Sequence, residues 1–212
     1  MKIYGADLST PVIKVRMVAN FLKIDYEYKK VDLRAGETRT EEFLRRHPAG
    51  KIPVIEDGSF VLFESNAIIR YLADKNNSEI YPKDLKQRAL VDQWIDFGSM
   101  HVGNGMTRVL YNKVIAPRFG LETDERSLKD GLKFLEQFLP VVDNQLKRMG
   151  CLASEKLTLA DFNLLATVDP LEAIGFDIFQ YAHLKKWRDQ LRTQEFYQKI
   201  HKFYGETMMT KR

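Results

Sequence analysis

The sequence is poor in the residues that cross-links and metal sites require. Its 212 residues include one cysteine, Cys151, and four histidines, whose spacing is not typical of metal ligands. A single cysteine excludes an intrachain disulfide and the Cys/His groups of a zinc site, and it fits a reducing compartment. We therefore expect no metal, and we interpret Cys151, beside Gly150 in a helical region, as a structural residue.

Long apolar runs are also absent. No stretch of about 18 or more consecutive apolar residues occurs, so no membrane span is expected. The first residues reach Asp7 before any apolar run of signal-peptide length. The 33 basic and 29 acidic side chains give a formal charge of +4 and are mixed along the chain, which does not indicate a nucleic-acid partner. The sequence predicts a cytoplasmic protein that binds neither membrane nor nucleic acid.

The start of the chain alternates between strand and helix patterns. Met1–Ala6 is typical of a short buried strand, and Pro11 favours the first turn of a helix that runs to Lys23. β-branched and aromatic residues between Tyr26 and Leu33 indicate a second strand. These patterns predict a strand-helix-strand unit, followed by a polar loop and a short irregular helix over Glu41–Arg46.

A hairpin and a third helix follow. Ile52–Glu56 and Ser59–Phe63 are two strand-like segments that flank Asp57-Gly58, a strong turn signal. Ser65 then has the position and residue type of a helix N-cap, and the apolar stripe of that helix ends near Asn76. The predicted order of elements is βαβ and then αββα, within residues 1–76.

The rest of the chain has only helical periodicity. A polar connector over residues 77–83 separates it from the first part, so we place a domain boundary there. Amphipathic patterns predict helices from Leu85 to about Tyr111, over 124–149, over 158–173 and from His183 to about Phe203. Thr158 and Asp161 have the spacing of a capping box. Residues 84–212 are predicted to form an all-helical domain.

Several separated motifs occur in the order found in one enzyme family. Met1–Gly5 and Ser9-Thr10 come first, Lys51–Pro53 and the Asp57-Gly58 turn follow, and Phe63–Ile68 comes last. Together they resemble the cytosolic glutathione S-transferases, in particular the serine-type phi and theta classes of that superfamily.

The resemblance extends over nearly the whole chain, because Val114–Asp124 looks like the phi-class linker between helices of the second domain. It implies an α/β thioredoxin-like N-terminal domain (βαβ-αββα), an all-α C-terminal domain and a homodimer. In the thioredoxin fold, the proline that opens the third strand follows a cis peptide bond. We therefore expect a cis bond before Pro53, although trans is the commoner state of an X-Pro bond.

The function implied by the resemblance is that of a glutathione transferase, which activates the glutathione thiol as a thiolate for attack on hydrophobic electrophiles or peroxides. By resemblance, Ser9 is the catalytic residue and donates a hydrogen bond to the thiolate, aided by the N-terminus of the following helix. Alternatively, Ser9 is only an N-cap and Thr10 supplies the hydroxyl. Glutathione would be a co-substrate, and no cofactor is expected. A different alternative is a non-catalytic transferase-like adaptor or ligand-binding module.

Glutathione carries two carboxylates, an ammonium and a peptide backbone, and the first domain offers partners for all of them. Ser65 offers its hydroxyl and backbone N–H groups to the γ-glutamyl carboxylate, and Glu64 can meet the ammonium. Arg39 and Lys51 are candidates for the glycine carboxylate, and each is as readily a solvated surface cation. The predicted glutathione-binding set consists of Arg39, Lys51, Ile52, Pro53, Glu64 and Ser65.

The predicted electrophile pocket lies beside this site, where the second domain begins. Methionine suits an adaptable apolar wall, although Met106 could equally belong to the core. The predicted wall residues are Pro11, Leu33, Met106 and Leu110.

Two positions depart from the family pattern. Thr38 stands where phi and theta sequences commonly have a histidine that contacts glutathione, and Ala49 stands where the phi pattern favours an aromatic residue. If that aromatic residue is an intersubunit contact, the dimer contact must differ in this chain.

Overall fold

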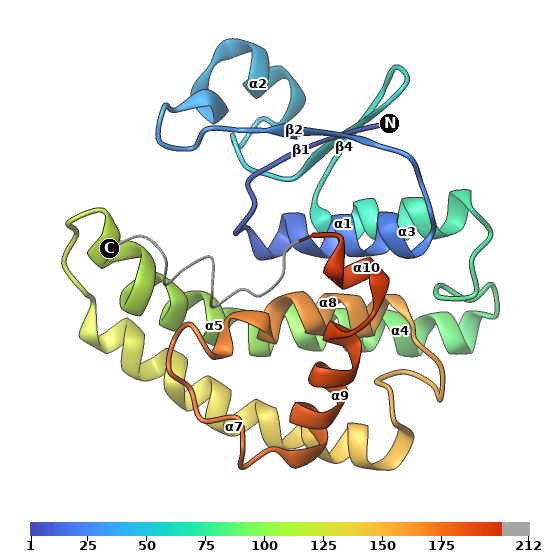
Figure 1. Ribbon diagram of the computed structural model, residues 1–212, viewed down its shortest axis with the longest axis vertical. Coiled ribbons are helices and arrows are strands. Elements are labelled where there is room, and N and C mark those ends of the chain that lie inside the picture. The colour runs from blue at the N-terminus through green and yellow to red at the C-terminus, as the bar shows by residue number, and fades with distance from the viewer. Residues whose placement is uncertain (201–212) are drawn as a thin grey trace.

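The computed structural model describes residues 1–200, and Figure 1 shows them as a small sheet stacked on a helical bundle. Helices α1 (Thr10–Phe21) and α3 (Ser65–Lys75) form a layer between the sheet and the bundle. The sheet has the order β2-β1-β3-β4. Its strands are β1 (Lys2–Gly5), β2 (Glu27–Lys30), β3 (Val54–Asp57) and β4 (Phe60–Phe63).

The pairing of the strands matches the predicted topology. Strand β2 pairs with β1 in parallel, whereas β3 pairs with β1 and with β4 in antiparallel fashion. Between β2 and β3 lie a 3₁₀ turn, η1 (Glu37–Arg39), and the short helix α2 (Glu41–Arg46). The predicted order βαβ-αββα is therefore confirmed.

The two faces of the sheet have different coverings, because side chains alternate along a strand. Ile3 and Ile55 point into the main core, toward α1 and α3. On the other face, Val54 and Tyr4 pack with Phe43 of α2 in a smaller apolar cluster. Sheet and helices therefore form three layers.

Two glycines meet local geometric requirements. A Cβ atom on Gly5 would lie 2.4 Å from a methyl group of Val12, so only glycine lets β1 approach α1 this closely. The β3–β4 hairpin turns over Gly58 and Ser59, where Gly58 has a φ of +63°. The predicted hairpin is confirmed, but its turn lies one residue later than the Asp57-Gly58 signal suggested.

The helical part begins with one long, irregular rod. Its segments are α4 (Leu85–Phe97), η2 (Gly98–Val102), α5 (Gly103–Leu110), η3 (Tyr111–Ile115) and α6 (Ala116–Arg118), with η2 and η3 in π-helical geometry. The helix predicted from Leu85 to about Tyr111 thus continues to Arg118, through much of the segment that resembled an interhelical linker.

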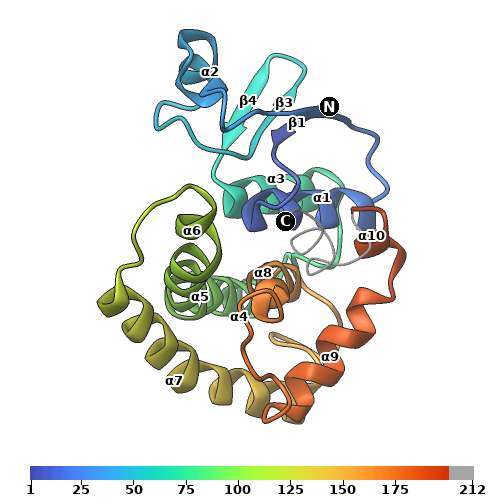
Figure 2. The same cartoon turned by 60° about the vertical axis from the view of Figure 1, so that its left-hand side comes forward.

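Helix α8 (Leu159–Val168) is the centre of the helical part. Of its ten residues only Thr167 is not buried, and Figure 2 shows α1, α4, α5 and α9 around it. At its N-terminus, the carboxylate of Asp161 accepts bonds from the backbone N–H and the hydroxyl of Thr158, at 2.9 and 3.0 Å. The predicted capping box is therefore confirmed, since Thr158 is the N-cap of the helix.

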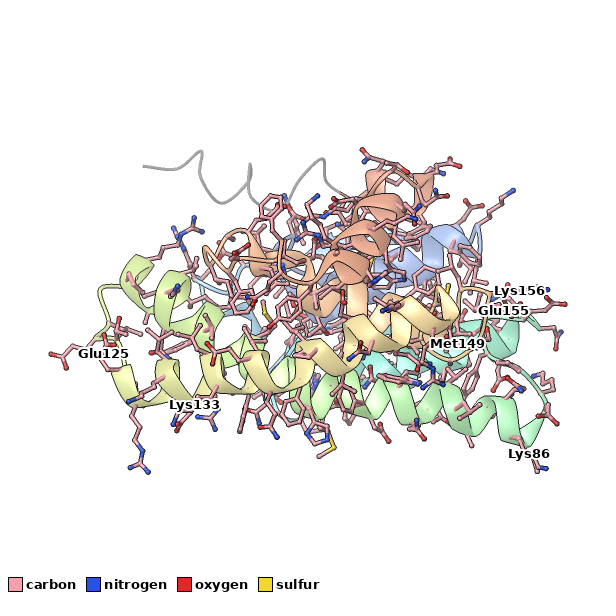
Figure 3. The ribbon with its side chains drawn as sticks, turned by 90° about the horizontal axis from the view of Figure 1, so that it is seen from below. Lys86, Glu125, Lys133, Met149, Glu155 and Lys156 are labelled. Atoms are coloured by element: carbon pink, nitrogen blue, oxygen red, sulfur yellow. The ribbon has the colours of Figure 1, made fainter. Side chains whose placement is uncertain are left out.

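The outer side of the helical part is formed by α7 (Glu125–Met149). Its buried residues recur at helical spacing, at Leu135, Leu139, Val142 and Leu146. Figure 3, in which Glu125, Lys133 and Met149 mark the course of α7, shows charged side chains on its outer face. The pattern is that of an amphipathic helix with one face in the core.

The chain closes with a 3₁₀ turn, η4 (Asp169–Leu171), and helices α9 (Ala182–Arg192) and α10 (Glu195–Gln198). The helix predicted from His183 to about Phe203 is thus two helices, and its last residues lie outside the described part. One continuous core joins the sheet-facing residues to the helical bundle. No helix within residues 1–200 is long and apolar enough to cross a membrane.

Candidate active site at the junction of the sheet domain and the helical bundle

A cavity of about 280 Å³ lies where α1 and the start of α3 meet the helical bundle. The first part of the chain contributes Thr10, Pro11, Lys14, Glu64, Ser65 and Asn66 to its lining. Facing residues of the bundle include Met106, Thr107, Leu110 and Asn163. The cavity therefore combines apolar walls with hydroxyl, amide and charged groups.

Three of the four predicted electrophile-pocket residues line this cavity, namely Pro11, Met106 and Leu110. Met106 is only 3% exposed, so it belongs to the hydrophobic core as well as to the cavity wall. Leu33 does not line the cavity and is 51% exposed, in the loop after β2. The structure thus brings Pro11 together with Met106 and Leu110 of the bundle, and it leaves Leu33 outside the cavity.

The start of α1 holds both hydroxyls considered for thiol activation. Ser9 is the N-cap residue, but its side chain makes no capping hydrogen bond. Its backbone N–H donates to the carbonyl of Ala6 at 3.1 Å, which fixes the turn between β1 and α1. Thr10 lines the cavity, whereas Ser9 is not among its lining residues. Ser9 therefore keeps a hydroxyl that the helix cap does not use, and Thr10 is the one closer to the bundle.

The start of α3 differs from the sequence prediction by one residue. Glu64, not Ser65, is the N-cap of α3, and Ser65 is the first residue of the helix. The predicted N-cap role of Ser65 is therefore wrong. Glu64 has a φ of 69°, in the left-handed region that non-glycine residues rarely adopt. This bend directs both residues into the cavity lining, at the helix end where backbone N–H groups lack intrahelical acceptors.

The predicted cis bond is confirmed, at Ile52-Pro53. The bond immediately precedes β3, which begins at Val54. Ile52 packs against the small cluster that contains Phe43, and Lys51 is exposed. Ile52 and Pro53 therefore precede the strand that the sequence assigned to them, and they form its entry.

Arg39 lies against the same loop from the other side. Its guanidinium donates to the carbonyl of Ala49 at 3.4 Å. Gly50 has a φ of +58°, and a Cβ atom there would lie 2.6 Å from the carbonyl oxygen of Thr38. The close approach brings Arg39 beside the segment that contains Lys51. Thr38 is buried at 7% exposure, so its side chain is enclosed at the position where the family commonly has a histidine.

Sequence reasoning missed a polar network in the cavity. The ammonium of Lys14 donates to the side-chain oxygens of Asn66, at 2.5 Å, and Asn163, at 2.8 Å. Asn66 donates onward to the hydroxyl of Ser99 at 3.0 Å, and Asn163 donates to the carbonyl of Ile95 at 3.1 Å. Lys14 thus links α1 to α3 and to α8, 149 positions away in the sequence.

The charge of Lys14 is poorly supported by its surroundings. Its side chain is buried, and burial, with a smaller contribution from Arg70, lowers the pKa of Lys14 to about 7, against a partial opposing effect of Glu64. The sequence gives one indication that Lys14 belongs to the site, namely its position four residues after Thr10, on the buried side of α1. Within residues 1–200, no group of three or more His, Cys, Asp or Glu side chains could hold a metal ion.

Comparison with known proteins identifies the family of this chain. Residues 1–74 match the family model described as the glutathione S-transferase N-terminal domain, and residues 101–195 match the corresponding C-terminal domain. The chain is also 30% identical to glutathione S-transferase 1 of Zea mays over 203 residues, 94% of this chain and 95% of that protein. The chain belongs to the glutathione S-transferase family.

Solved structures of this family have the same fold. A glutathione S-transferase I bound with lactoylglutathione superimposes with a TM-score of 0.86 at 30% identity, over 94% of this chain and 97% of that one. Glutathione transferase F7 from Populus trichocarpa gives a TM-score of 0.87 at 28% identity, over 94% and 96% of the two chains. The predicted fold and glutathione S-transferase family are thus confirmed, and the plant relatives support the phi-like assignment.

Proposed function

We propose that this glutathione S-transferase binds glutathione on residues 1–76 and a second substrate in the cavity that faces residues 84–212, with 77–83 as the linker. The observation that carries the proposal is the single cavity that joins Thr10, Glu64 and Ser65 to the bundle wall at Met106 and Leu110. A thiol held at the first set of residues would face an electrophile held at the second.

The glutathione site is built around the start of α3. Ser65 and the free backbone N–H groups of the first turn suit a carboxylate, both by hydrogen bonding and by the helix dipole. Glu64 supplies the opposite charge for the ammonium. Ile52, at the entry to β3, can pair with the extended backbone of the peptide. Arg39 and Lys51, on adjoining loops, are assigned to the glycine carboxylate.

Activation of the thiol is assigned to the start of α1. A hydroxyl that donates to the thiolate, together with the helix N-terminus, stabilises the charged form of sulfur. Ser9 has a hydroxyl unused by the helix cap, and Thr10 has a place on the cavity wall. Ser9 is the catalytic residue of the proposal, and Thr10 is its direct rival. The thiolate would attack an electrophilic carbon or a peroxide oxygen.

The protein is also proposed to be a cytoplasmic homodimer. Exposed apolar side chains on β4 and α4 support a subunit contact, since Phe60, Val61, Phe63 and Leu90 are each between 37% and 45% exposed. Ala49, where the phi pattern favours an aromatic residue, lies in the loop after α2, two residues from His47, whose ring contacts Phe63 of β4 with centroids 4.5 Å apart. A light-scattering mass of a single chain at micromolar concentration would refute the dimer.

The decisive experiment is a pH series of glutathione conjugation with chlorodinitrobenzene. A hydrogen bond to a charged group is worth about 1.5–3 kcal/mol, which lowers a thiol pKa of about 8.5 by about one to two units. Ser9→Ala should therefore lower kcat at neutral pH, shift the profile upward and leave the KM for glutathione nearly unchanged. Thr10→Val serves as the matched variant. If only Thr10→Val produces the shift, the catalytic role belongs to Thr10.

Glutathione binding is tested separately by calorimetry. Glu64→Ala and Ser65→Ala should each weaken binding by about tenfold or more, because each removes a partner of a charged group. Ser59→Ala, in the hairpin turn, is the control and should bind normally. Wild-type protein that binds no glutathione, or variants with unchanged affinity, would reject this site.

A further inference from the structure

Lys14 is a buried cation in the lining of the cavity, and no carboxylate of residues 1–200 lies within ion-pair distance of it. Its ammonium donates instead to two neutral amide oxygens, those of Asn66 and Asn163. An ammonium carries three donors, so one donor remains after these two bonds. Buried ammonium groups are normally paired with an acid or bound to an anion, and this one has no acidic partner in the described part of the chain.

The charged groups that act on Lys14 are few. Glu64, at the start of α3, favours the ammonium, and Arg70, further along α3, opposes it. Arg70 itself is paired with Asp92, at 2.8 Å. The elements that pack on Lys14 from the bundle present the neutral side chains of Asn163 and Ser99.

Glutathione would leave this imbalance in place. In the proposed function, each of its charged groups near Lys14 has a partner of its own: Glu64 for the ammonium, Ser65 and the first turn of α3 for the γ-glutamyl carboxylate, and the start of α1 for the thiolate. Lys14 therefore still lacks a counter-charge in the cavity where the second substrate binds. An anionic group on that substrate would replace the missing counter-charge.

We propose that the second substrate is an electrophile with an anionic group, such as a carboxylate, which Lys14 binds while the apolar body of the molecule contacts Met106 and Leu110. This inference rests on the proposed transferase function and narrows its substrate class. Asn66 and Asn163 orient the ammonium from two sides, and the side chains of Thr107 and Thr167 add further hydroxyls to the wall. Lys14 is thus a specificity-determining residue, because its ammonium favours an anionic electrophile over an uncharged one of similar shape.

The test compares two substrates that differ in one charge. A chlorodinitrobenzoate anion and its uncharged methyl ester are conjugated with glutathione, and each kcat/KM is divided by the uncatalysed rate. Wild-type protein should prefer the anion, and Lys14→Met should reduce the ratio of anion to ester by about tenfold or more. Lys14→Arg retains the charge and should keep most of the preference. Lys86→Met, exposed near the start of α4 (Figure 3), is the control.

A second measurement needs no variant of Lys14. Calorimetric binding of dinitrobenzoate, which has no leaving group, is measured on glutathione-saturated wild-type protein in buffers of different ionisation enthalpy at about pH 8. An anion at contact distance raises the pKa of an ammonium by about one to three units, so binding should take up about half a proton or more. Methyl dinitrobenzoate should take up none.

The outcomes separate this inference from the proposed function. Conjugation of neither substrate by the wild type would reject the transferase function itself. The inference alone would be overturned if the wild type conjugates both substrates, Lys14→Met leaves the ratio of anion to ester unchanged, and dinitrobenzoate binds without proton uptake. Equal slowing of anion and ester by Lys14→Met would assign the ammonium to the thiolate instead, and would also overturn it.

Discussion

Asp169, immediately after α8, is predicted to be one of the most sensitive positions for stability. Its carboxylate is fully buried and accepts hydrogen bonds from Arg192 at 2.8 and 3.0 Å and from the hydroxyl of Tyr197 at 2.8 Å. Burial and the neighbouring carboxylate raise the pKa of Tyr197, so its hydroxyl remains a donor. Asp169 thereby connects the end of α8 to both α9 and α10.

The size of the effect follows from what Asp169→Ala leaves behind. Removing one partner of a buried ion pair costs about 3–5 kcal/mol, because the other charge remains buried and unpaired. Arg192 also contacts Glu172, at 3.1 Å, and Glu172 is partly exposed, so some compensation remains. We therefore expect a loss near the lower limit, about 3 kcal/mol. That is a large fraction of an ordinary folding free energy of about 5–15 kcal/mol.

The assay is urea denaturation followed by circular dichroism, with all proteins at one concentration. With an m-value of about 3 kcal/mol/M, the midpoint of Asp169→Ala should fall by about 1 M. Asp25→Ala, at an exposed position, is the matched control and should stay within about 0.5 kcal/mol of wild type. A loss below about 1 kcal/mol for Asp169→Ala would refute the reasoning, because it would mean that Arg192 and Tyr197 find other partners at no cost.

Three further predictions concern other parts of the molecule. Gly5→Ala should destabilise the protein by about 1–3 kcal/mol in the same assay, since its Cβ would overlap Val12; an unchanged midpoint would contradict the packing of β1 on α1. Burial raises the pKa of Cys151 to about 12, so an aromatic disulfide reagent at neutral pH should react with it only slowly in the native state and promptly after denaturation. Because the pKa of Lys14 is lowered to about 7, Lys14 loses its proton at a lower pH in the folded state than in the unfolded state. Relative to Lys14→Met, stability should therefore rise from about pH 7 to about pH 10, by on the order of 1 kcal/mol per pH unit, and parallel pH dependences would refute this.

The sequence was sufficient for the features that depend on local patterns. The strand-helix order and the capping box at Thr158 follow from residue types at short spacing, and both are present. The cis bond before Pro53 is also present, but it was expected from the family resemblance, since local sequence alone favours trans. The error at Ser65 has a physical cause. Serine is the favoured N-cap type, but the chain bends at Glu64, so the cap lies one residue earlier.

Tertiary contacts were beyond the reach of such patterns. Lys14 has the spacing of a core position on α1, and its partner Asn163 belongs to a helix far along the chain. Neither residue type indicates the other, because long-range pairing leaves no periodic signal. The exposed position of Leu33 has a similar origin, since the course of the loop after β2 decides which way an isolated apolar residue lies.

One continuous core runs from Ile3 of β1 to Leu165 of α8. It limits which segments can be exchanged between this protein and its relatives. A chimera that joined residues 1–76 of this chain to the helical half of a relative would pack α1 against the α8 of that relative. The buried side chains at that contact would then no longer be matched in shape. Tolerated crossovers should therefore carry α1 and α8 together, even though the connector near residue 80 is the more obvious place to cut. The two halves therefore behave as a single unit of packing.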